Sequence, residues 1–259
     1  MPGADWSGVA VVTGAAGGIG AEVARALAAT GVPVALLDRD ITALWGLAAE
    51  LEGCDGGVLA VAVDVTDSAD VDAAIAKVEA QLGPIAYLVN GAGVLRSGPA
   101  SELTDEEWDV TFAVNASGVF HVSRSVARLM TPRGRGSIVT IASNAALTPR
   151  TSMAAYAASK AASAMFTKCL GLELARHGIR CNVVAPGSTR TPMLTALQGE
   201  AAERASVEGV PEAYRVGIPL GRIAEPAHVA DAVLFLLSER SSHITMHDLT
   251  VDGGAALGT

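Results

Sequence analysis

The regular alternation of short apolar runs with longer helical stretches is the feature that most constrains the fold of this chain. Apolar runs of about five residues that end in a polar residue or a glycine are typical of strands buried in a parallel sheet. We expect strands at residues 9–12, 32–37, 57–63, 85–89, 136–142, 179–185 and 249–251, and helices at 21–30, 41–52, 68–82, 104–130, 153–177, 193–197, 200–205 and 226–237. This order predicts an α/β fold, with a doubly wound parallel sheet of about seven strands and helices on both faces.

Nothing in the sequence divides the chain into smaller units. We find no linker, repeat or low-complexity segment, so we expect one domain that spans residues 1–259. The segment 188–220 is less regular than the rest, and we expect it to form a lid over a substrate. Four side chains in this segment, Met193, Leu194, Leu197 and Tyr214, could cover an apolar ring and exclude water.

The composition excludes several classes of partner. The net charge is -9 and there is no long basic run, which argues against a nucleic-acid partner. No stretch approaches the roughly 18 uncharged apolar residues of a membrane span, and the first residues lack the pattern of a signal peptide. The three cysteines match no metal or redox spacing, which favours free thiols in the cytoplasm. His243 and His247 have no acidic cluster beside them, so we predict no metal site.

A glycine-rich loop joins the first expected strand to the first helix. Gly14, Gly18 and Gly20 lie where a tight turn lets the backbone approach a pyrophosphate, and the following helix N-terminus favours its charge. Asp38 ends the next strand, where an acid can accept hydrogen bonds from an adenosine ribose. Its charge would repel a 2′-phosphate, which favours NAD over NADP. The neighbouring Arg39 could instead hold that phosphate, stack on adenine or lie in solvent.

Tyr156 and Lys160 form the candidate catalytic pair. On a helix, residues four positions apart lie on the same face. A lysine beside a tyrosine favours the phenolate and lowers the pKa of the phenol from about 10. The spacing therefore predicts a general base, although many helices carry such a pair on an exposed face.

These motifs, taken together, resemble the classical short-chain dehydrogenase/reductase family. The matching pieces run in family order over nearly the whole chain: 13–20 (TGAAGGIG), Asp64-Val65, 90–93 (NGAG), Asn115, Ser143, Tyr156 with Lys160, and Pro186-Gly187. The family more often has two asparagines where this chain has Asn90-Gly91. The resemblance implies a Rossmann domain and an oxidoreductase.

Within this resemblance the family assigns four catalytic residues. Tyr156 is the general base, and Lys160 lowers the pKa of its phenol and bonds the nicotinamide ribose. Ser143 orients the substrate oxygen, and Asn115 supports a water that links Lys160 to solvent. For Asn115 and Asn90, a structural role in pinning strands or a helix kink is an alternative compatible with the functional one.

The resemblance also implies the set of residues that bind the cofactor, for which we expect NAD. These are Gly14, Gly18, Ile19, Gly20, Asp38, Arg39, Asp64, Val65, Asn90, Gly91, Gly93, Tyr156, Lys160, Pro186, Gly187, Thr189 and Thr191. Asp64 and Val65 would flank adenine, and Thr189 and Thr191 would hold the nicotinamide amide.

Longer stretches narrow the expected substrate to a small cyclic hydroxy acid. Residues 93–98 (GVLRSG) and 146–150 (ALTPR) resemble members of the family that oxidise a cyclohexadiene diol acid in catechol siderophore pathways. Such an acid needs a cation for its carboxylate, and an arginine can bind it through two hydrogen bonds. Arg96 and Arg150 are the candidates, with Ser143 and Met193 completing the expected substrate site. A surface charge or a salt bridge between subunits explains either arginine equally well, and Arg190 is a third candidate.

Other functions remain open from the sequence. The amino analogue of the diol acid carries the same carboxylate, and a 3-oxoacyl reductase would use the same four catalytic residues. A nucleotide-sensing scaffold is also compatible with the fold, since fold alone does not give function. Only an enzyme, however, needs all four catalytic residues. The resemblance further implies a homotetramer built through the two long helices at 104–130 and 153–177.

Overall fold

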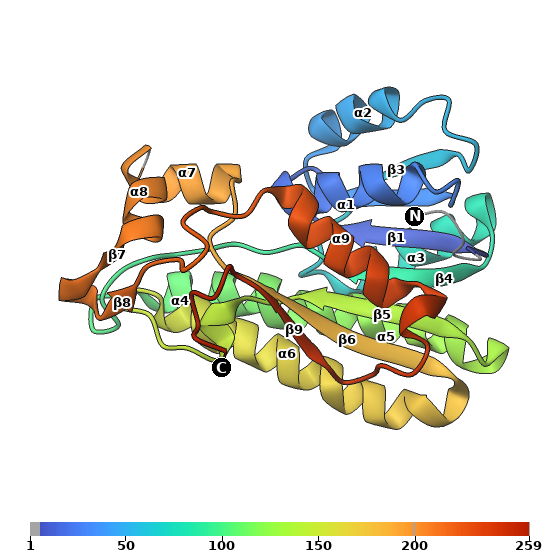
Figure 1. The fold of residues 1–259 in the computed structure, drawn as a ribbon. Coiled ribbons are helices and arrows are strands. Elements are labelled where there is room, and N and C mark those ends of the chain that lie inside the picture. The colour runs from blue at the N-terminus through green and yellow to red at the C-terminus, as the bar shows by residue number, and fades with distance from the viewer. Residues whose placement is uncertain (1–5, 199, 259) are drawn as a thin grey trace.

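The computed structural model describes residues 6–198 and 200–258, which form one Rossmann-like α/β domain around a parallel seven-stranded sheet. The strands are β1 (Val9–Thr13), β2 (Val34–Asp38), β3 (Val58–Ala62), β4 (Ile85–Asn90), β5 (Gly136–Ile141), β6 (Ile179–Pro186) and β9 (Asp248–Val251). Their order across the sheet is β3-β2-β1-β4-β5-β6-β9 (Figure 1). The expected fold class is therefore confirmed. The strand order reverses between β1 and β4, and in such sheets a ligand crevice opens at that point.

Helices cover both faces of the sheet (Figure 1). One side carries α1 (Gly18–Ala28), α2 (Ile41–Glu50) and α9 (Pro226–Leu237). The other carries α3 (Ser68–Leu82), α5 (Val119–Met130) and α6 (Ala154–Leu174). Alternate residues of β1 divide between the two layers: Ala10 and Val12 pack with α1 and α9, whereas Val9 and Val11 pack with α3 and α5. Strands that are buried on both faces explain the continuous apolar runs in the sequence.

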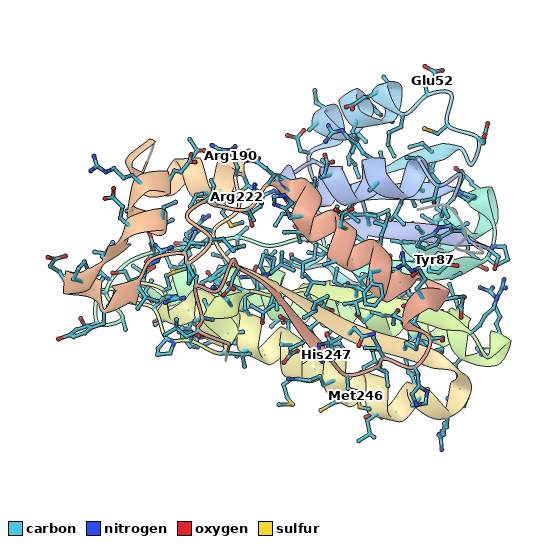
Figure 2. All side chains as sticks on the ribbon, in the orientation of Figure 1. Glu52, Tyr87, Arg190, Arg222, Met246 and His247 are labelled. Atoms are coloured by element: carbon cyan, nitrogen blue, oxygen red, sulfur yellow. The ribbon has the colours of Figure 1, made fainter. Side chains whose placement is uncertain are left out.

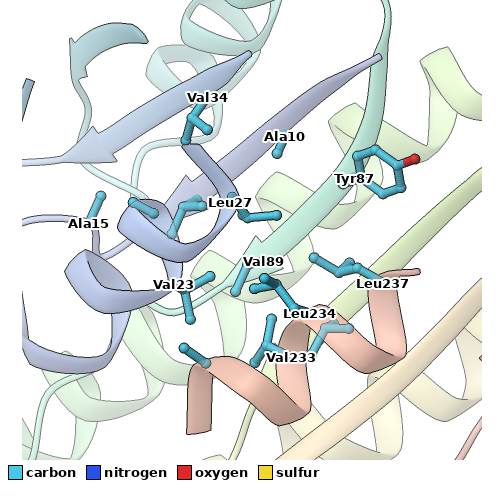
Figure 3. Packing of buried hydrophobic residues seen from close by; sticks show 14 of the residues in the cluster. Ala10, Ala15, Val23, Leu27, Val34, Tyr87, Val89, Val233, Leu234 and Leu237 are labelled. Atoms are coloured by element: carbon cyan, nitrogen blue, oxygen red, sulfur yellow. The ribbon is translucent and has the colours of Figure 1, made fainter. Parts of the chain in front are cut away.

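The packing beneath α1 and α9 is built from small and branched side chains (Figure 3). Val23 and Leu27 of α1 meet Val233 and Leu234 of α9 over Val89 of β4, and all five side chains are at most 4% exposed. Small and branched residues let the two helices approach both the sheet and each other. This packing fixes the N-terminus of α1, and with it the glycine loop, relative to the end of β4.

The expected helix at 104–130 is present, but it is not α-helical throughout. It begins with α4 (Asp105–Phe112), passes through one π-helical segment, η1 (Ala113–Gly118), and continues as α5. The capping box expected at its start is present: Thr104 accepts from the Glu107 amide, and the Glu107 carboxylate accepts from the Thr104 amide. The π-helical segment contains Asn115, whose side chain bonds to other elements. A wide turn of this kind is a frequent mark of a functional site.

The segment 188–220 contains more regular structure than the sequence indicates. Two helices, α7 (Pro192–Gln198) and α8 (Glu200–Glu208), precede a small antiparallel hairpin of β7 (Gly209–Val210) and β8 (Arg215–Val216). This hairpin was not expected, because strands of two residues leave no periodic pattern. Residue 199 and the side chains of 197–202, including Leu197, lie outside what the structure describes. The segment follows the carboxyl end of β6, on the side of the sheet where the crevice opens.

Arg180 in β6 holds the C-terminal end of α9. Its guanidinium donates to the carbonyls of Leu236 at 2.6 Å, Leu237 at 2.9 Å and Ser238 at 3.0 Å. It also donates to the Ser241 hydroxyl at 2.9 Å. These carbonyls are among those that a helix end leaves without partners, and the cation suits the negative end of the helix dipole.

We predict that Arg180→Met destabilises the fold by about 3 kcal/mol, because the carbonyls of buried residues lose a charged donor. Urea unfolding followed by circular dichroism measures this as a lower midpoint with an unchanged slope. Arg176→Met is the control, since Arg176 is exposed and bonds only to His177 among the described residues. Equal midpoints for the two variants would contradict the assignment.

Candidate active site

A cavity of about 640 Å³ opens at the carboxyl ends of the central strands. It lies at the ends of β1 and β4, where the strand order reverses, which is the position expected for a ligand crevice in a doubly wound sheet. Its walls come from the glycine loop, the ends of β2, β4, β5 and β6, the start of α6, and the segment 188–220. A volume of this size is typical of a site for a small molecule or a cofactor.

The glycine loop forms one wall of the cavity and has no room for a side chain at three of its glycines. A Cβ on Gly20 would lie 2.1 Å from the Gly14 carbonyl oxygen, and a Cβ on Gly14 would lie 2.6 Å from the Ala92 nitrogen. A Cβ on Gly18 would lie 2.6 Å from Cγ2 of Thr191. Each of these glycines is thus required by close approach of the chain to itself. The resulting bare backbone at the N-terminus of α1 suits a phosphate group.

Two acidic residues and one arginine line the cavity beside the glycine loop. Asp38 ends β2 and accepts from the Ala16 amide at 3.2 Å and the Asp40 amide at 3.2 Å, which leaves its carboxylate facing the cavity. Hydrogen bonds from Thr66, with a smaller contribution from the charge of Arg39, lower the pKa of Asp64. The Asp64 carboxylate is therefore ionised at neutral pH, and the exposed Arg39 lies close to it.

The residues expected to bind a cofactor line this cavity, with one correction. They are Gly14, Gly18, Ile19, Gly20, Asp38, Arg39, Asp64, Val65, Gly91, Gly93, Tyr156, Lys160, Pro186, Gly187, Thr189 and Thr191. Asn90 does not: its side chain is in the core and donates to Ser123 at 2.9 Å and Thr140 at 3.2 Å. As the last residue of β4 it points sideways to α5 and β5, so the structural role is the one its geometry supports.

Tyr156, Lys160 and Ser143 converge on one wall of the cavity. Ser143 follows β5, and the other two lie in the first turns of α6. The Lys160 ammonium donates to the Ile141 carbonyl at 2.8 Å and lies 5.8 Å from the centroid of the Tyr156 ring. Both side chains of the pair are almost fully buried, with Tyr156 8% and Lys160 5% exposed.

Burial dominates the titration of this pair. It lowers the pKa of Lys160 to about 8. It raises the pKa of Tyr156, and the adjacent Ser143 hydroxyl opposes that shift only in part. The sequence predicted a lowered pKa for the phenol. The direction differs because desolvation outweighs the attraction of an ammonium that is bound to the Ile141 carbonyl.

Asn115 lies directly behind the cavity wall. Its side chain accepts from the Val94 amide at 2.8 Å and donates to the Val94 carbonyl at 2.9 Å and to the Ser159 hydroxyl at 3.0 Å. Its side chain and the Lys160 ammonium meet at Gly93, where a Cβ would lie 3.5 Å from the Asn115 oxygen and 3.2 Å from Nζ. Asn115 thus ties the segment after β4 to α6 at the position of the lysine.

The expected substrate residues separate into two groups. Arg150 and Met193 line the cavity together with Ser143. Arg96 is exposed and lies outside the lining, and its only described hydrogen bond is to the Leu95 carbonyl. Tyr214 is 92% exposed and also lies outside the lining, so its expected part in covering a ring is wrong.

Arg190, the third arginine considered, is engaged elsewhere. Its guanidinium forms ion pairs with Glu203 at 2.6 Å and Glu225 at 2.9 Å on the outer side of the segment. Figure 2 shows it near α7 and the start of α9. These pairs leave its charge compensated.

Arg215 is a cavity residue that the sequence analysis missed. It lies at the start of β8, is half-buried, and lines the cavity together with Val210 and Ala213 of the same hairpin. Its guanidinium donates to the Ser188 hydroxyl at 2.8 Å and the Ser206 hydroxyl at 3.2 Å. No motif marks it, because its position depends on a hairpin that has no sequence pattern.

Neither a metal cluster nor a membrane helix is found among residues 6–198 and 200–258. No group of three or more potential metal ligands comes together there, and His247 lies beside β9, away from the cavity (Figure 2). No helix of this part of the chain is long and apolar enough to cross a membrane.

The cavity fits a nicotinamide dinucleotide on structural grounds. The bare backbone at Gly14–Gly20 can hold the pyrophosphate, and Asp38 can hold a ribose. Thr189 and Thr191 line the same cavity as Tyr156 and Lys160, and Thr191 lies against Gly18 of the loop. The cavity thus has candidate contacts for both the adenosine end and the nicotinamide end of the dinucleotide.

Comparisons with known proteins agree with this geometry. Residues 8–202 match the family model described as short chain dehydrogenase. The chain is 53% identical over 252 residues to a 2,3-dihydro-2,3-dihydroxybenzoate dehydrogenase of Bacillus subtilis (strain 168), covering 96% of each chain. It is 42% identical to the Escherichia coli (strain K12) protein of the same name, covering 98% of this chain and 99% of that one. The crystal structure of a 3-ketoacyl-(acyl-carrier-protein) reductase from Brucella melitensis complexed with NADH is 33% identical, has a TM-score of 0.87, and covers 96% of this chain and 98% of that one.

These similarities confirm the family expected from the sequence motifs. The chain belongs to the short-chain dehydrogenase/reductase family and is an oxidoreductase that acts on a CH–OH group with a nicotinamide cofactor.

Proposed function

We propose that the enzyme oxidises a ring carbinol of 2,3-dihydro-2,3-dihydroxybenzoate with NAD, giving 2,3-dihydroxybenzoate for a catechol siderophore. Arg150 is the observation that carries this substrate class. It brings a cation with no ion-pair partner among the described residues into the cavity that holds Tyr156, Lys160 and Ser143. Relatives that carry this activity in their names support the choice, at 53% and 42% identity over nearly the whole chain.

The reacting residues have separate roles in this proposal. Ser143 holds the carbinol oxygen, and Tyr156 accepts its proton as the C–H bond breaks. The nicotinamide, when bound, accepts the hydride. Lys160 keeps a positive charge beside the phenolate, and Asn115 fixes the backbone that positions Lys160. The ketone formed then tautomerises to the aromatic catechol, which makes the oxidation strongly favourable.

The function is tested by NADH formation with purified enzyme and four substrates. We expect turnover of the dihydrodiol acid, and a kcat/KM at least about tenfold lower for its amino analogue, 2,3-dihydro-3-hydroxyanthranilate. A plain cyclic secondary alcohol should react more slowly still, because it leaves Arg150 without an anion. In the reverse direction, a 3-oxoacyl thioester should not be reduced. Turnover of only the plain alcohol or the thioester would overturn the proposed substrate.

We predict that kcat/KM for oxidation rises with pH to a plateau with an inflection near pH 8. The Lys160 ammonium lies 5.8 Å from the centroid of the Tyr156 ring, so we expect the pair to give up its first proton as a unit. The lower of the two values, about 8 for Lys160, sets where that proton leaves. A fraction of the resulting state keeps its proton on the lysine and presents the phenolate. Below the inflection the rate should rise about tenfold per pH unit.

The control for this profile is Tyr156→Phe. It should lose about 10²–10⁴-fold in kcat, because the proton acceptor is absent. It should still bind NAD, as measured by protein fluorescence, since the dinucleotide wall is unchanged. A flat pH profile in the wild type, or retained activity in the variant, would remove Tyr156 from the mechanism.

The choice of NAD is a further part of the proposal, supported by the Asp38 carboxylate in the cavity. We predict that Asp38→Asn raises the ratio of kcat/KM for NADP to that for NAD at least about tenfold. Removing the charge relieves repulsion of the 2′-phosphate. Asp40→Asn serves as the control, because Asp40 caps α2 outside the cavity lining. Unchanged ratios in both variants would show that Asp38 does not select the cofactor.

We also propose a homotetramer built through α4, α5 and α6. Large apolar side chains are exposed on these helices: Trp108 is 43%, Phe120 39%, Met165 58% and Leu172 69% exposed. Gathered apolar surface of this kind is typical of protein–protein contacts.

We place the enzyme in the cytoplasm. Cys54, Cys169 and Cys181 are all free thiols, as expected in a reducing compartment. We further propose that the segment 188–220 acts as a lid over the substrate, and that the domain extends over residues 1–259, whose two ends lie outside the described residues.

A further inference from the structure

Two arginines from different parts of the fold line the same cavity. Arg150 lies in the loop between β5 and α6, on the body of the domain. Arg215 lies in the β7–β8 hairpin of the segment 188–220. Figure 1 shows this hairpin at the end of the molecule, together with α7 and α8. One guanidinium group therefore comes from the body of the domain and the other from the segment 188–220, and both line the same cavity.

Neither of these arginines forms an ion pair with a described carboxylate. Arg150 donates to the Ala255 carbonyl at 3.4 Å, and Arg215 donates only to the hydroxyls of Ser188 and Ser206. Arg190 in the same segment shows the usual arrangement, with two glutamates on its guanidinium. The contrast marks Arg150 and Arg215 as cations whose partner is not part of the described chain.

Arg150, Arg215 and the nearby Asp252 together carry one net positive charge. Burial lowers the pKa of Arg215, and the nearby charge of Arg150 lowers it further, so the two cations repel each other. Burial also lowers the pKa of Arg150, which the charge of Asp252 opposes. The Asp252 carboxylate accepts from Asn144 and from the backbone of the C-terminal tail, so it is already fully engaged. A single monoanion would balance the two arginines and this acid.

Local structure holds Arg215 toward the cavity. The register of the hairpin pairs it with Val210, and Gly209 adopts a φ of +85° where a Cβ would lie 2.7 Å from the Arg215 carbonyl. Ser206, one of its hydrogen-bond partners, is only 1% exposed. The side chain is thus directed by backbone that has little freedom, unlike a surface arginine.

We propose that Arg215 and Arg150 bind the substrate carboxylate together, and that the bound carboxylate holds the segment 188–220 against the body of the domain. This inference rests on the proposed function, because it requires a substrate with a ring carboxylate. Arg150 supplies the cation on the fixed side, and Arg215 supplies the one that moves with the segment. The carboxylate replaces the repulsion between them with attraction to both.

This arrangement makes the carboxylate a requirement for turnover as well as for affinity. A ring diol without the carboxylate can still reach Ser143 and Tyr156, but the two arginines keep repelling each other above it. The segment then excludes water less well from the reacting carbons. Removal of Arg215 should therefore impair turnover of the acid and not turnover of the neutral diol.

The test compares Arg215→Met with the wild type on two substrates, 2,3-dihydro-2,3-dihydroxybenzoate and the same dihydrodiol without the carboxylate. For the acid we expect KM to rise about ten- to hundredfold and kcat to fall, because a charged hydrogen bond is lost. For the neutral diol kcat/KM should not fall, because the variant also removes the repulsion between the two cations. Arg215→Lys should recover only part of the loss, because an ammonium keeps the charge but lacks the planar donor pair.

Arg204→Met is the matched control. Arg204 belongs to the same segment, is exposed, and bonds to Glu208 on the surface of α8, so this variant makes the same charge change away from the cavity. It should match the wild type on both substrates. An equal loss on both substrates in Arg215→Met would mean a structural role and overturn the proposal, as would an unchanged KM for the acid.

A binding measurement separates this inference from the proposed function. Calorimetric titration with benzoate should give an affinity that Arg215→Met and Arg150→Met each lower about tenfold or more. Benzoate affinity that depends on both arginines, in an enzyme that does not oxidise the diol acid, would remove the proposed substrate and keep the carboxylate site. Oxidation of the acid with benzoate affinity independent of Arg215 would keep the function and remove the site.

Discussion

The close contact between the ends of β1 and β4 is the constraint on which the rest of this structure depends. Thr13 Oγ1 accepts from the amides of Gly91 and Ala92, and a Cβ on Gly14 or Gly91 would lie 2.6 Å from backbone of the other strand. Only glycine fits at both positions. The contact forms the floor of the crevice at the point where the strand order reverses. The glycine loop and the side chains of Tyr156 and Lys160 therefore line one cavity above the same backbone.

The chemistry follows from how little water reaches that floor. Lys160 and Tyr156 are both almost fully buried, and burial brings the pKa of the lysine down to about 8. A pair in water would titrate near 10, where neither group exchanges a proton usefully at neutral pH. Asn115 keeps the pair in place at the cost of a regular helix: its bonds to Val94 and Ser159 need the wide turn of η1. The α-helix changes to a π-helix at this point, where the Asn115 side chain and the Lys160 ammonium both lie against Gly93.

The sequence predicted the strands, the helices and the glycine loop well, and it predicted poorly the features that depend on contacts distant in the chain. Long apolar runs and glycines reflect backbone constraints that are local, which is why the strands, α9 and the loop at Gly14–Gly20 were predicted nearly to the residue. Three other features depend on contacts between residues far apart in the chain. They are the π-helical segment η1 at Asn115, the hairpin at Arg215 and the core position of Asn90. The direction of the Tyr156 pKa depends on burial, which spacing along a helix does not report.

The division between body and segment explains how one catalytic frame can serve different alcohols. Ser143 follows β5, and Tyr156 and Lys160 lie on α6, so the sheet and the helix packed on it hold these side chains independently of a substrate. In the proposed site, recognition of the substrate is shared with the segment after β6, where a two-residue strand positions Arg215. The segment is packed through a small cluster that is separate from the two main ones, in which its Ile218 lies with Ile223 and Ala255. Substrate choice can therefore change in this enzyme at little cost to the stability of the sheet.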